Sequence, residues 1–218
     1  MKLPVIIVNF KATQGAVGAA AVRLAKICDR VAKQTKASVA VAVQATDLAA
    51  VAKAVSIPVL AQHVDPVDLG SYTGHVPPRL VKMHGAAGTL LNHSEHRLPK
   101  DVLRNAIRKA RAEGLWVCAC ANTPADAAAV AKLGPDAVAI EPPELIGGTV
   151  SVSVAHPSIL TRTTHAIKKI PVLCGAGVHT TQDVIIARKL HTKGILVASG
   201  ITKAKNPAKA LRELIAGL

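Results

Sequence analysis

The stretch of residues 171–200, PVLCGAGVHTTQDVIIARKLHTKGILVASG, holds two short apolar runs, PVLCGAG and GILVASG, with a helical pattern between them. Each run is apolar at consecutive positions, which is typical of a strand with both faces covered. Residues 180–190 predict a helix, and Thr180 is a suitable N-cap residue for it. A strand, a helix and a second strand in this order predict a parallel βαβ unit.

The same pattern recurs along the chain. Six further runs rich in Val, Ile, Leu and Ala precede this unit: VIIVNF near Val5, SVAVAV near Val41, PVLAQH near Leu60, GTLLNH near Leu90, WVCACA near Cys118 and DAVAIE near Ile140. Helical patterns occupy residues 18–34 and 99–113, and a last one at 206–216 has Asn206 as its N-cap. In the first of these helices, Leu24, Cys28 and Val31 form one apolar face.

Eight strand and helix units in one chain predict a closed (β/α)₈ barrel, because an open doubly wound sheet usually has fewer strands. The chain has 218 residues. Since this fold typically needs about 250, we expect one domain spanning residues 1–218 with shortened outer helices. Residues 63–78 and 140–152 are predicted to be the longer loops. In such a barrel the chemistry lies at the carboxyl ends of the strands.

Composition narrows the classes of function. No apolar run approaches the roughly 20 residues of a membrane span, and we expect neither a signal peptide nor an anchor. The 27 Lys and Arg residues exceed the 13 Asp and Glu residues by 14 charges, which favours anionic partners: nucleic acid, an acidic membrane or a phosphate ester. Aromatic residues make up 1% of the chain, which argues against stacking on RNA or single strands. Four cysteines without a CxxC pair indicate reduced thiols in the cytoplasm and argue against zinc.

Polar and glycine residues follow the predicted strands. They are Asn9 and Lys11 after the first, Asn92 and His93 after the fourth, Glu141 after the sixth, Gly175 and Gly177 after the seventh, and Ser199 and Gly200 after the eighth. A carboxylate, an imidazole, an ammonium group and glycine-flanked amides at one mouth suit proton transfer on a phosphorylated substrate. Paired glycine turns after the last two strands match the phosphate site of many barrels.

Each of these residues also has a plainer interpretation. Glu141 could be an exposed loop acid, but the following Pro142 and Pro143 restrict the backbone and favour a held carboxylate. His93 could be structural; if the following SEHR began a short helix, its N-terminus would favour a neutral ring. The glycines could form ordinary tight turns.

Six segments, in order along nearly the whole chain, resemble the triosephosphate isomerase family. They are NFK at 9–11, YTGHV at 72–76, NHSEHR at 92–97, EPPELIG at 141–147, CGAGV at 174–178 and GILVASG at 194–200. The short chain and the EPPELIG segment are most similar to the compact archaeal branch. The resemblance implies a TIM barrel that interconverts dihydroxyacetone phosphate and D-glyceraldehyde 3-phosphate, in glycolysis and gluconeogenesis, without metal or organic cofactor.

The resemblance also implies residue roles. Glu141 would be the base that moves a proton between adjacent carbons through an enediolate, His93 the electrophile, and Lys11 the cation that holds developing negative charge. Glu95 would pair with Lys11. The substrate-binding set would comprise Asn9, Phe10, Lys11, Ile146, Gly147, Gly177, Ala198 and Ser199.

A lid that closes over the site would begin at Glu141, with Pro142 and Pro143 as its hinge and Gly147 and Gly148 at its tip. The chain departs from the family here, since EPPELIGGT replaces the more widespread EPVWAIGTG, and HSEHR replaces HSERR. The family resemblance further implies a homo-oligomer, a tetramer built from dimers. Tyr72, Thr73 and Gly74 would contact a neighbour's site, and the Ala-rich residues 124–133 would supply a second apolar contact.

Two other functions fit parts of the pattern. Another phosphate-binding barrel enzyme, such as an isomerase or lyase of amino-acid biosynthesis, would share the last two glycine turns but not the NFK, NHSE and EPPELIG combination. A basic RNA-binding module would account for the net charge of +14, and its affinity would fall linearly with salt on logarithmic scales. The combination of motifs favours the isomerase, with no membrane contact and no nucleic acid partner.

Overall fold

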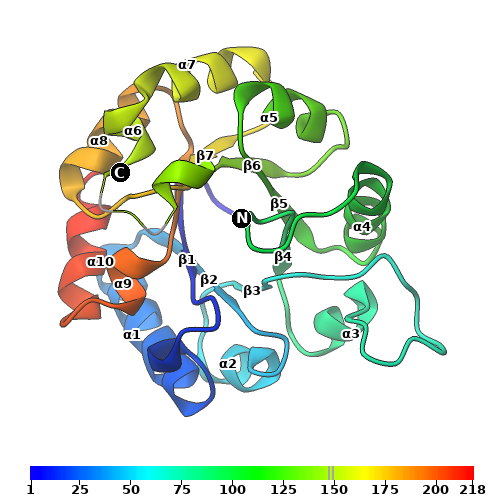
Figure 1. Ribbon diagram of the computed structural model, residues 1–218. Helices are drawn as coiled ribbons and strands as arrows, with labels where there is room; N and C mark the ends of the chain where they lie inside the picture. Colours follow the sequence, from blue (N-terminus) through cyan, green and yellow to red (C-terminus); the bar gives the residue numbers. More distant parts are fainter. Residues whose placement is uncertain (147, 149) are drawn as a thin grey trace.

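Eight parallel strands close into a barrel in the computed structural model, which describes residues 1–146, 148 and 150–218. The strands pair in sequence order and β8 returns to β1, with Val5 opposite Gly194. Their bounds are β1 Val5–Asn9, β2 Ser38–Val43, β3 Val59–Ala61, β4 Gly88–Leu91, β5 Trp116–Ala121, β6 Ala137–Ile140, β7 Val172–Cys174 and β8 Gly194–Val197. Figure 1 shows the strands around the axis and the helices in an outer ring. The predicted barrel is confirmed.

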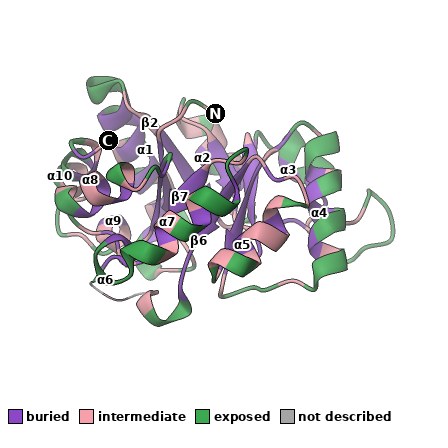
Figure 2. Cartoon of the chain, turned by 90° about the horizontal axis from the view of Figure 1, so that it is seen from above, coloured by how far each residue is buried: buried purple, intermediate pink, exposed green. Residues whose placement is uncertain are grey.

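Successive side chains of each strand serve two separate cores. On β1, Val5 and Ile7 point into the barrel, whereas Ile6 and Val8 pack against the helices. This alternation explains why the strands are apolar at consecutive positions, since both faces are covered. Figure 2 shows the buried strands enclosed by helices whose outer faces are exposed.

The outer elements are short, as predicted. They are η1 Gln14–Ala16, α1 Ala19–Thr35, α2 Leu48–Ala54, α3 Pro78–Met83, α4 Lys100–Ala112, α5 Pro124–Ala131, η2 Pro143–Leu145, α6 Val152–Ala155, α7 Pro157–Ala166, α8 Thr181–Lys189, α9 Ser199–Thr202 and α10 Pro207–Ile215. The helix α2 has 7 residues and α3 has 6, whereas α1 has 17.

The predicted helix ends and faces are also present. Thr180 caps α8 by accepting the backbone N–H of Asp183, and Asn206 caps α10 by accepting that of Lys209. The α1 residues Leu24, Cys28 and Val31 are buried. The caps and apolar faces therefore fix the outer ring where the sequence pattern predicted it.

Two longer connections lie at the carboxyl ends of the strands. Residues 62–77 leave β3 and project beside α3 (Figure 1), and the hydrogen bond from the Val76 backbone N–H to Asp65 Oδ2, 2.7 Å long, closes the base of this loop. Residues 141–151 connect β6 to α6 and contain η2. Within the described part of the chain, no helix combines the length and apolarity needed to traverse a bilayer.

Candidate active site

A cavity of about 320 Å³ opens at the carboxyl ends of the strands. It is lined by residues at the carboxyl ends of β1, β4, β6, β7 and β8 and in the segments that follow them: Asn9, Lys11, Thr13, His93, Glu95, Glu141, Ile146, Gly175, Ala176, Gly177, Val178, His179, Leu196, Val197, Ala198, Ser199, Thr202 and Lys203. Nine residues with predicted catalytic or substrate-binding roles lie within the described ranges, and all but Phe10 line the cavity: Asn9, Lys11, His93, Glu141, Ile146, Gly177, Ala198 and Ser199.

Lys11 lies in the turn that directly follows β1 and lines the cavity. Val5 and Ile7 point inward, so Asn9 does too, and its Oδ1 accepts the Lys11 backbone N–H at 3.1 Å. Lys11 has a φ of 51°, an uncommon conformation for a residue with a side chain. Its Nζ lies 2.7 Å from Glu95 Oε1, and this ion pair fixes the ammonium group at the cavity wall.

Glu141 reaches the cavity by the same alternation on β6, where Ala137 and Ala139 point inward. Its residue is 2% exposed, Oε1 lies 3.5 Å from His93 Nε2, and Oε2 has no hydrogen-bond partner among the described residues. The packing around Glu141 leaves no room for a side chain at Gly175, since a Cβ there would lie 2.5 Å from Glu141 Cγ. A buried carboxylate oxygen without a partner is costly, which is typical of a functional group.

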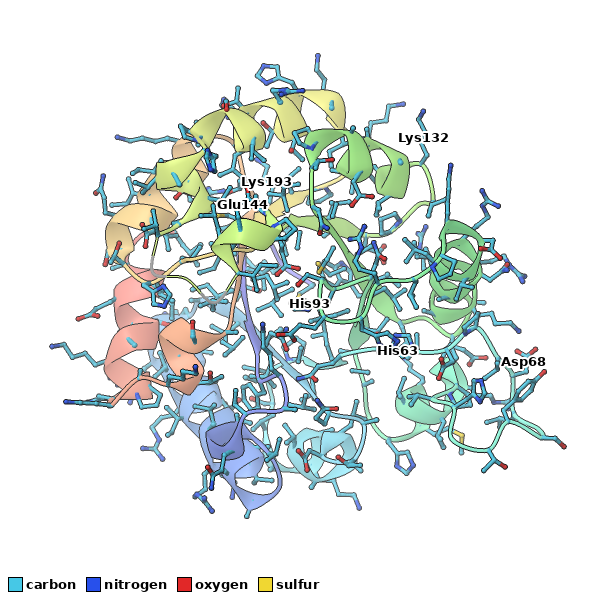
Figure 3. All side chains as sticks on the ribbon, in the orientation of Figure 1. His63, Asp68, His93, Lys132, Glu144 and Lys193 are labelled. Carbon is cyan, nitrogen blue, oxygen red and sulfur yellow. The ribbon has the colours of Figure 1, made fainter. Side chains whose placement is uncertain are left out.

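His93 is aimed by the backbone turn before it. Asn92 has a φ of 60°, and its side chain is held on both sides, by Cys120 O at 2.9 Å and by the Leu98 backbone N–H at 3.0 Å. Strict alternation from Leu90 would turn His93 outward, but this left-handed residue redirects the chain. In Figure 3, His93 lies near the middle of the ring of strands.

The short helix considered after His93 is not present, because residues 94 and 95 form a hydrogen-bonded turn instead. The turn also favours a neutral imidazole ring, through a backbone hydrogen bond. The Glu95 backbone N–H donates to His93 Nδ1 at 3.2 Å, which requires a lone pair on Nδ1 and leaves the proton on Nε2. The Nε2–H therefore faces Glu141 and the cavity.

The turns after β7 and β8 form the opposite wall. Gly177 has a φ of 67°, and a Cβ there would lie 1.9 Å from Val150 O, so this position requires glycine. After β8, Ala198 precedes the short helix α9, whose first residue is Ser199. Closely approaching backbone with exposed N–H groups suits a phosphate group.

Four polar residues of the cavity lining were not predicted: Thr13, His179, Thr202 and Lys203. His179 is the most connected, with Nδ1 3.1 Å from Gly177 O and Nε2 3.3 Å from Ser199 Oγ. It lies two residues beyond the glycine turn, on a connection whose path the strand pattern does not define.

Two predicted residues lie elsewhere. Phe10 is fully buried in the core between barrel and helices, because β1 alternation turns it away from Asn9 and Lys11, so its side chain does not join the site. Thr73 lies on the exposed tip of residues 69–75, outside the cavity of its own chain. Gly147 lies outside the described residues.

Beneath the cavity, the barrel core contains the buried thiols of Cys118 and Cys120. Burial, followed by the negative charge of Glu141, raises the pKa of Cys120 well above its ordinary value. Burial, followed by the charge of Glu141, likewise raises the pKa of Cys118. These thiols are therefore protonated packing groups.

Comparisons with known proteins agree with this geometry. The sequence model of the family described as triosephosphate isomerase matches residues 4–216. Triosephosphate isomerase of Methanosarcina barkeri is 43% identical, with 99% of each chain covered, and that of Caldivirga maquilingensis is 44% identical, with 98% of this chain and 97% of the relative covered. A solved triosephosphate isomerase from Bartonella henselae has the same fold, with a TM-score of 0.76 at 18% identity over 97% of this chain and 99% of that chain. The chain belongs to the triosephosphate isomerase family.

Proposed function

We propose that this chain interconverts dihydroxyacetone phosphate and D-glyceraldehyde 3-phosphate at the cavity, by proton transfer between adjacent carbons. The observation that carries the proposal is the Glu141 carboxylate. It is 2% exposed, has one oxygen without a partner among the described residues, and lies 3.5 Å from an imidazole nitrogen. A desolvated carboxylate beside a hydrogen-bond donor suits the removal of a proton next to a carbonyl group.

Glu141 acts as the base and His93 as the electrophile. Oε2 of Glu141 accepts the proton from one carbon and returns it to the next. The Nε2–H of His93 donates to the substrate oxygens as negative charge develops on them. This division of roles follows the family's known mechanism, and the tautomer fixed by the Glu95 backbone N–H supports it for this chain.

Lys11 holds the negative charge of the enediolate. Its Nζ lies at the cavity wall, and its partner Glu95 is more exposed, with side-chain exposures of 20% and 57% respectively. This ion pair holds the ammonium group in place while leaving it partly exposed. Asn9 fixes the Lys11 backbone and adds a polar group beside the substrate.

The phosphate group binds at the opposite wall. The backbone near Gly177, Ala198 and Ser199 provides donors there, and Ile146 closes the side toward the β6 loop. A three-carbon substrate then spans the distance from this wall to Glu141, which accounts for a cavity of only about 320 Å³.

Residues after Glu141 form a lid over the bound substrate. Pro142 and Pro143 restrict the hinge, and Pro143 begins η2. Closure excludes water from the enediolate, which protects it from loss of phosphate and strengthens each charge contact.

We also propose a homo-oligomer, a tetramer built from dimers. Tyr72 and Leu69 are 46% and 50% exposed on the projecting loop after β3 (Figure 1), which suits docking into a neighbour's site with Thr73. The half-buried Ala128, Ala131 and Leu133 of the α5 region suit the second contact. Light scattering should give a tetramer, and a stable, fully active monomer would contradict this assembly.

The described cysteines are all free, which fits a reducing compartment, and we propose a cytoplasmic location. The phosphate-barrel and RNA-binding alternatives lack support from the family match.

A coupled assay with purified protein and glyceraldehyde 3-phosphate tests the function. We expect turnover that 2-phosphoglycolate, a mimic of the enediolate, inhibits competitively. No turnover by folded protein would refute the proposal.

A further inference from the structure

We propose that His179 is a positioning residue that directs the hydroxyl group of Ser199 toward the substrate phosphate, and that its protonated form strengthens phosphate binding. The inference rests on the proposed function, since it assigns a further role at the same end of the cavity. It adds a titratable side chain beside the backbone amides of this wall.

The contacts of the His179 ring define this role. Nδ1 lies 3.1 Å from Gly177 O, and Nε2 lies 3.3 Å from Ser199 Oγ. The ring thus bridges the turn after β7 and the turn after β8. All three residues line the cavity.

The two turns also touch through their backbones, so the bridge is not a chance contact of a loose side chain. A Cβ on Gly200 would lie 2.9 Å from Val178 O and 3.6 Å from the Cα of His179. From below, Asp183 Oδ2 accepts the backbone N–H groups of His179 and Thr180 at 3.0 Å and 2.8 Å. The His179 backbone is therefore held on two sides.

The acceptor at Nδ1 decides where the protons lie. A carbonyl oxygen can only accept, so Nδ1 carries a proton and donates it to Gly177 O. In the neutral ring, Nε2 has a lone pair, and the Ser199 hydroxyl group donates its single proton to it. The lone pairs of Ser199 Oγ then face the cavity, where they repel a phosphate oxygen.

Protonation of the ring reverses this hydrogen bond. Nε2–H donates to Ser199 Oγ, which frees the hydroxyl proton to donate to phosphate, and the ring adds a positive charge. Histidine is the side chain that ordinarily changes charge between about pH 5 and 8. Binding of a phosphate dianion and binding of a proton at His179 therefore favour each other.

Other charged groups surround this pair. Lys11, Lys203, Glu95 and Glu141 line the same cavity, and Asp183 lies under the turn with its Oδ2 bound to backbone N–H groups. His93 faces Glu141 at the other end. Because these groups also respond to pH, the test compares variants that leave all of them in place.

Sulfate is the appropriate probe, since it remains a dianion throughout the neutral range, whereas a phosphate ester titrates there. Calorimetry would measure sulfate affinity of the wild type, His179→Gln and Ser199→Ala at pH 6.0 to 8.5, in two buffers of different ionisation enthalpy. We expect the wild type to take up a proton on binding and to bind sulfate on the order of tenfold more tightly at the acidic end. His179→Gln should lose this gain and the proton uptake.

Ser199→Ala tests the bridge itself and should lose most of the pH dependence while keeping His179. His84→Gln, an exposed histidine at the end of α3, serves as the matched control and should behave as the wild type. Competition with 2-phosphoglycolate restricts the signal to the cavity. Equal pH dependence in the wild type and His179→Gln would overturn the proposal, and full pH dependence in Ser199→Ala would overturn the role of the hydroxyl group.

The assay separates this inference from the proposed function. Sulfate binding needs no turnover, so a wild type that binds sulfate with proton uptake but does not isomerise triose phosphate would refute the function alone. An active isomerase whose sulfate binding is unaffected by His179→Gln would refute the inference alone.

Discussion

The two ends of the barrel each contain a hollow, and the larger one is not the candidate site. The hollow at the amino ends of the strands has a volume of about 520 Å³, against about 320 Å³ at the carboxyl ends. It is cationic, with Lys168, Lys169, Arg188, His191 and Lys193 around it and no carboxylate among its described lining residues. A large volume and a positively charged lining are therefore not sufficient to identify the candidate active site of this chain. The carboxyl end differs by its buried acid, its oriented imidazole and its close backbone turns.

Two carboxylates, Asp29 and Glu141, show the same difference between the two ends of the barrel. Asp29 lies toward the amino end, and its Oδ1 accepts the Ser56 hydroxyl at 2.6 Å and the Ser56 and Ile57 backbone N–H groups at 3.0 and 3.2 Å. Lys33 donates to its Oδ2 at 2.7 Å. Glu141, by contrast, has an oxygen without a partner in the described part of the chain. One carboxylate stabilises the fold, and the other is left available for chemistry.

The largest expected effect is that of Glu141→Asp. The shorter side chain withdraws the carboxylate by about 1 Å, which should lower kcat on the order of 10²-fold while leaving the fold intact. The coupled assay and thermal unfolding would measure both effects. Glu213→Asp, the same change on the exposed face of α10, is the control. Wild-type turnover by Glu141→Asp would contradict the role of Glu141 as the base at the carboxyl end of the barrel.

Lys11→Ala should act mainly on substrate binding. Losing a charged hydrogen-bond donor should raise KM and the inhibition constant of 2-phosphoglycolate roughly tenfold to a hundredfold. Lys193→Ala, at the amino-end hollow, should leave both constants unchanged. If the two variants had equal effects, the general positive field, rather than the geometry of the cavity, would account for binding.

Gly177→Ala tests the close backbone approach at the phosphate wall. The new Cβ would lie 1.9 Å from Val150 O at a φ of 67°. We expect a loss of roughly 2 to 3 kcal/mol in the free energy of unfolding, with weaker phosphate binding. Gly18→Ala is the control, because Gly18 has a φ of 57° and its Cβ would meet nothing within 4 Å. Equal losses in the two variants would attribute the effect to the dihedral angle alone.

The smallest effect is expected for Asp29→Asn, on stability without activity. Burial would raise the pKa of Asp29, but hydrogen bonds from Lys33 and Ser56 outweigh it and lower the pKa below 3.8. The charged form therefore stabilises the fold above that pH, and this stabilisation is lost as the pH falls through the lowered pKa.

The Asn variant should accordingly be less stable by about 1 kcal/mol at pH 7, and the difference should shrink in acid. Urea unfolding at several pH values would measure it. A loss of turnover without a loss of stability would contradict the structural role of Asp29.

Sequence patterns predicted the barrel because its strands are covered on both faces. Such strands are apolar at consecutive positions instead of alternating between apolar and polar residues, and this pattern is visible in the sequence. They also predicted Lys11 and Glu141, since both lie directly after a strand. The short helix considered after His93 is not present, since a turn lies there, and Phe10 does not reach the cavity with its side chain.

His179 was missed for a physical reason. Its place in the cavity depends on the turns after β7 and β8 touching at Gly200, a contact between segments about twenty residues apart that no local pattern encodes. The same limit applies to His93, whose direction depends on the left-handed backbone of Asn92.

A crystal structure with 2-phosphoglycolate bound tests the central claim most directly. We predict one ligand at the carboxyl end, with its carboxylate against Glu141, His93 and Lys11 and its phosphate against the backbone near Gly177 and Ser199. A ligand bound only among the lysines of the amino-end hollow, or a cavity ligand that touches none of those three side chains, would contradict it.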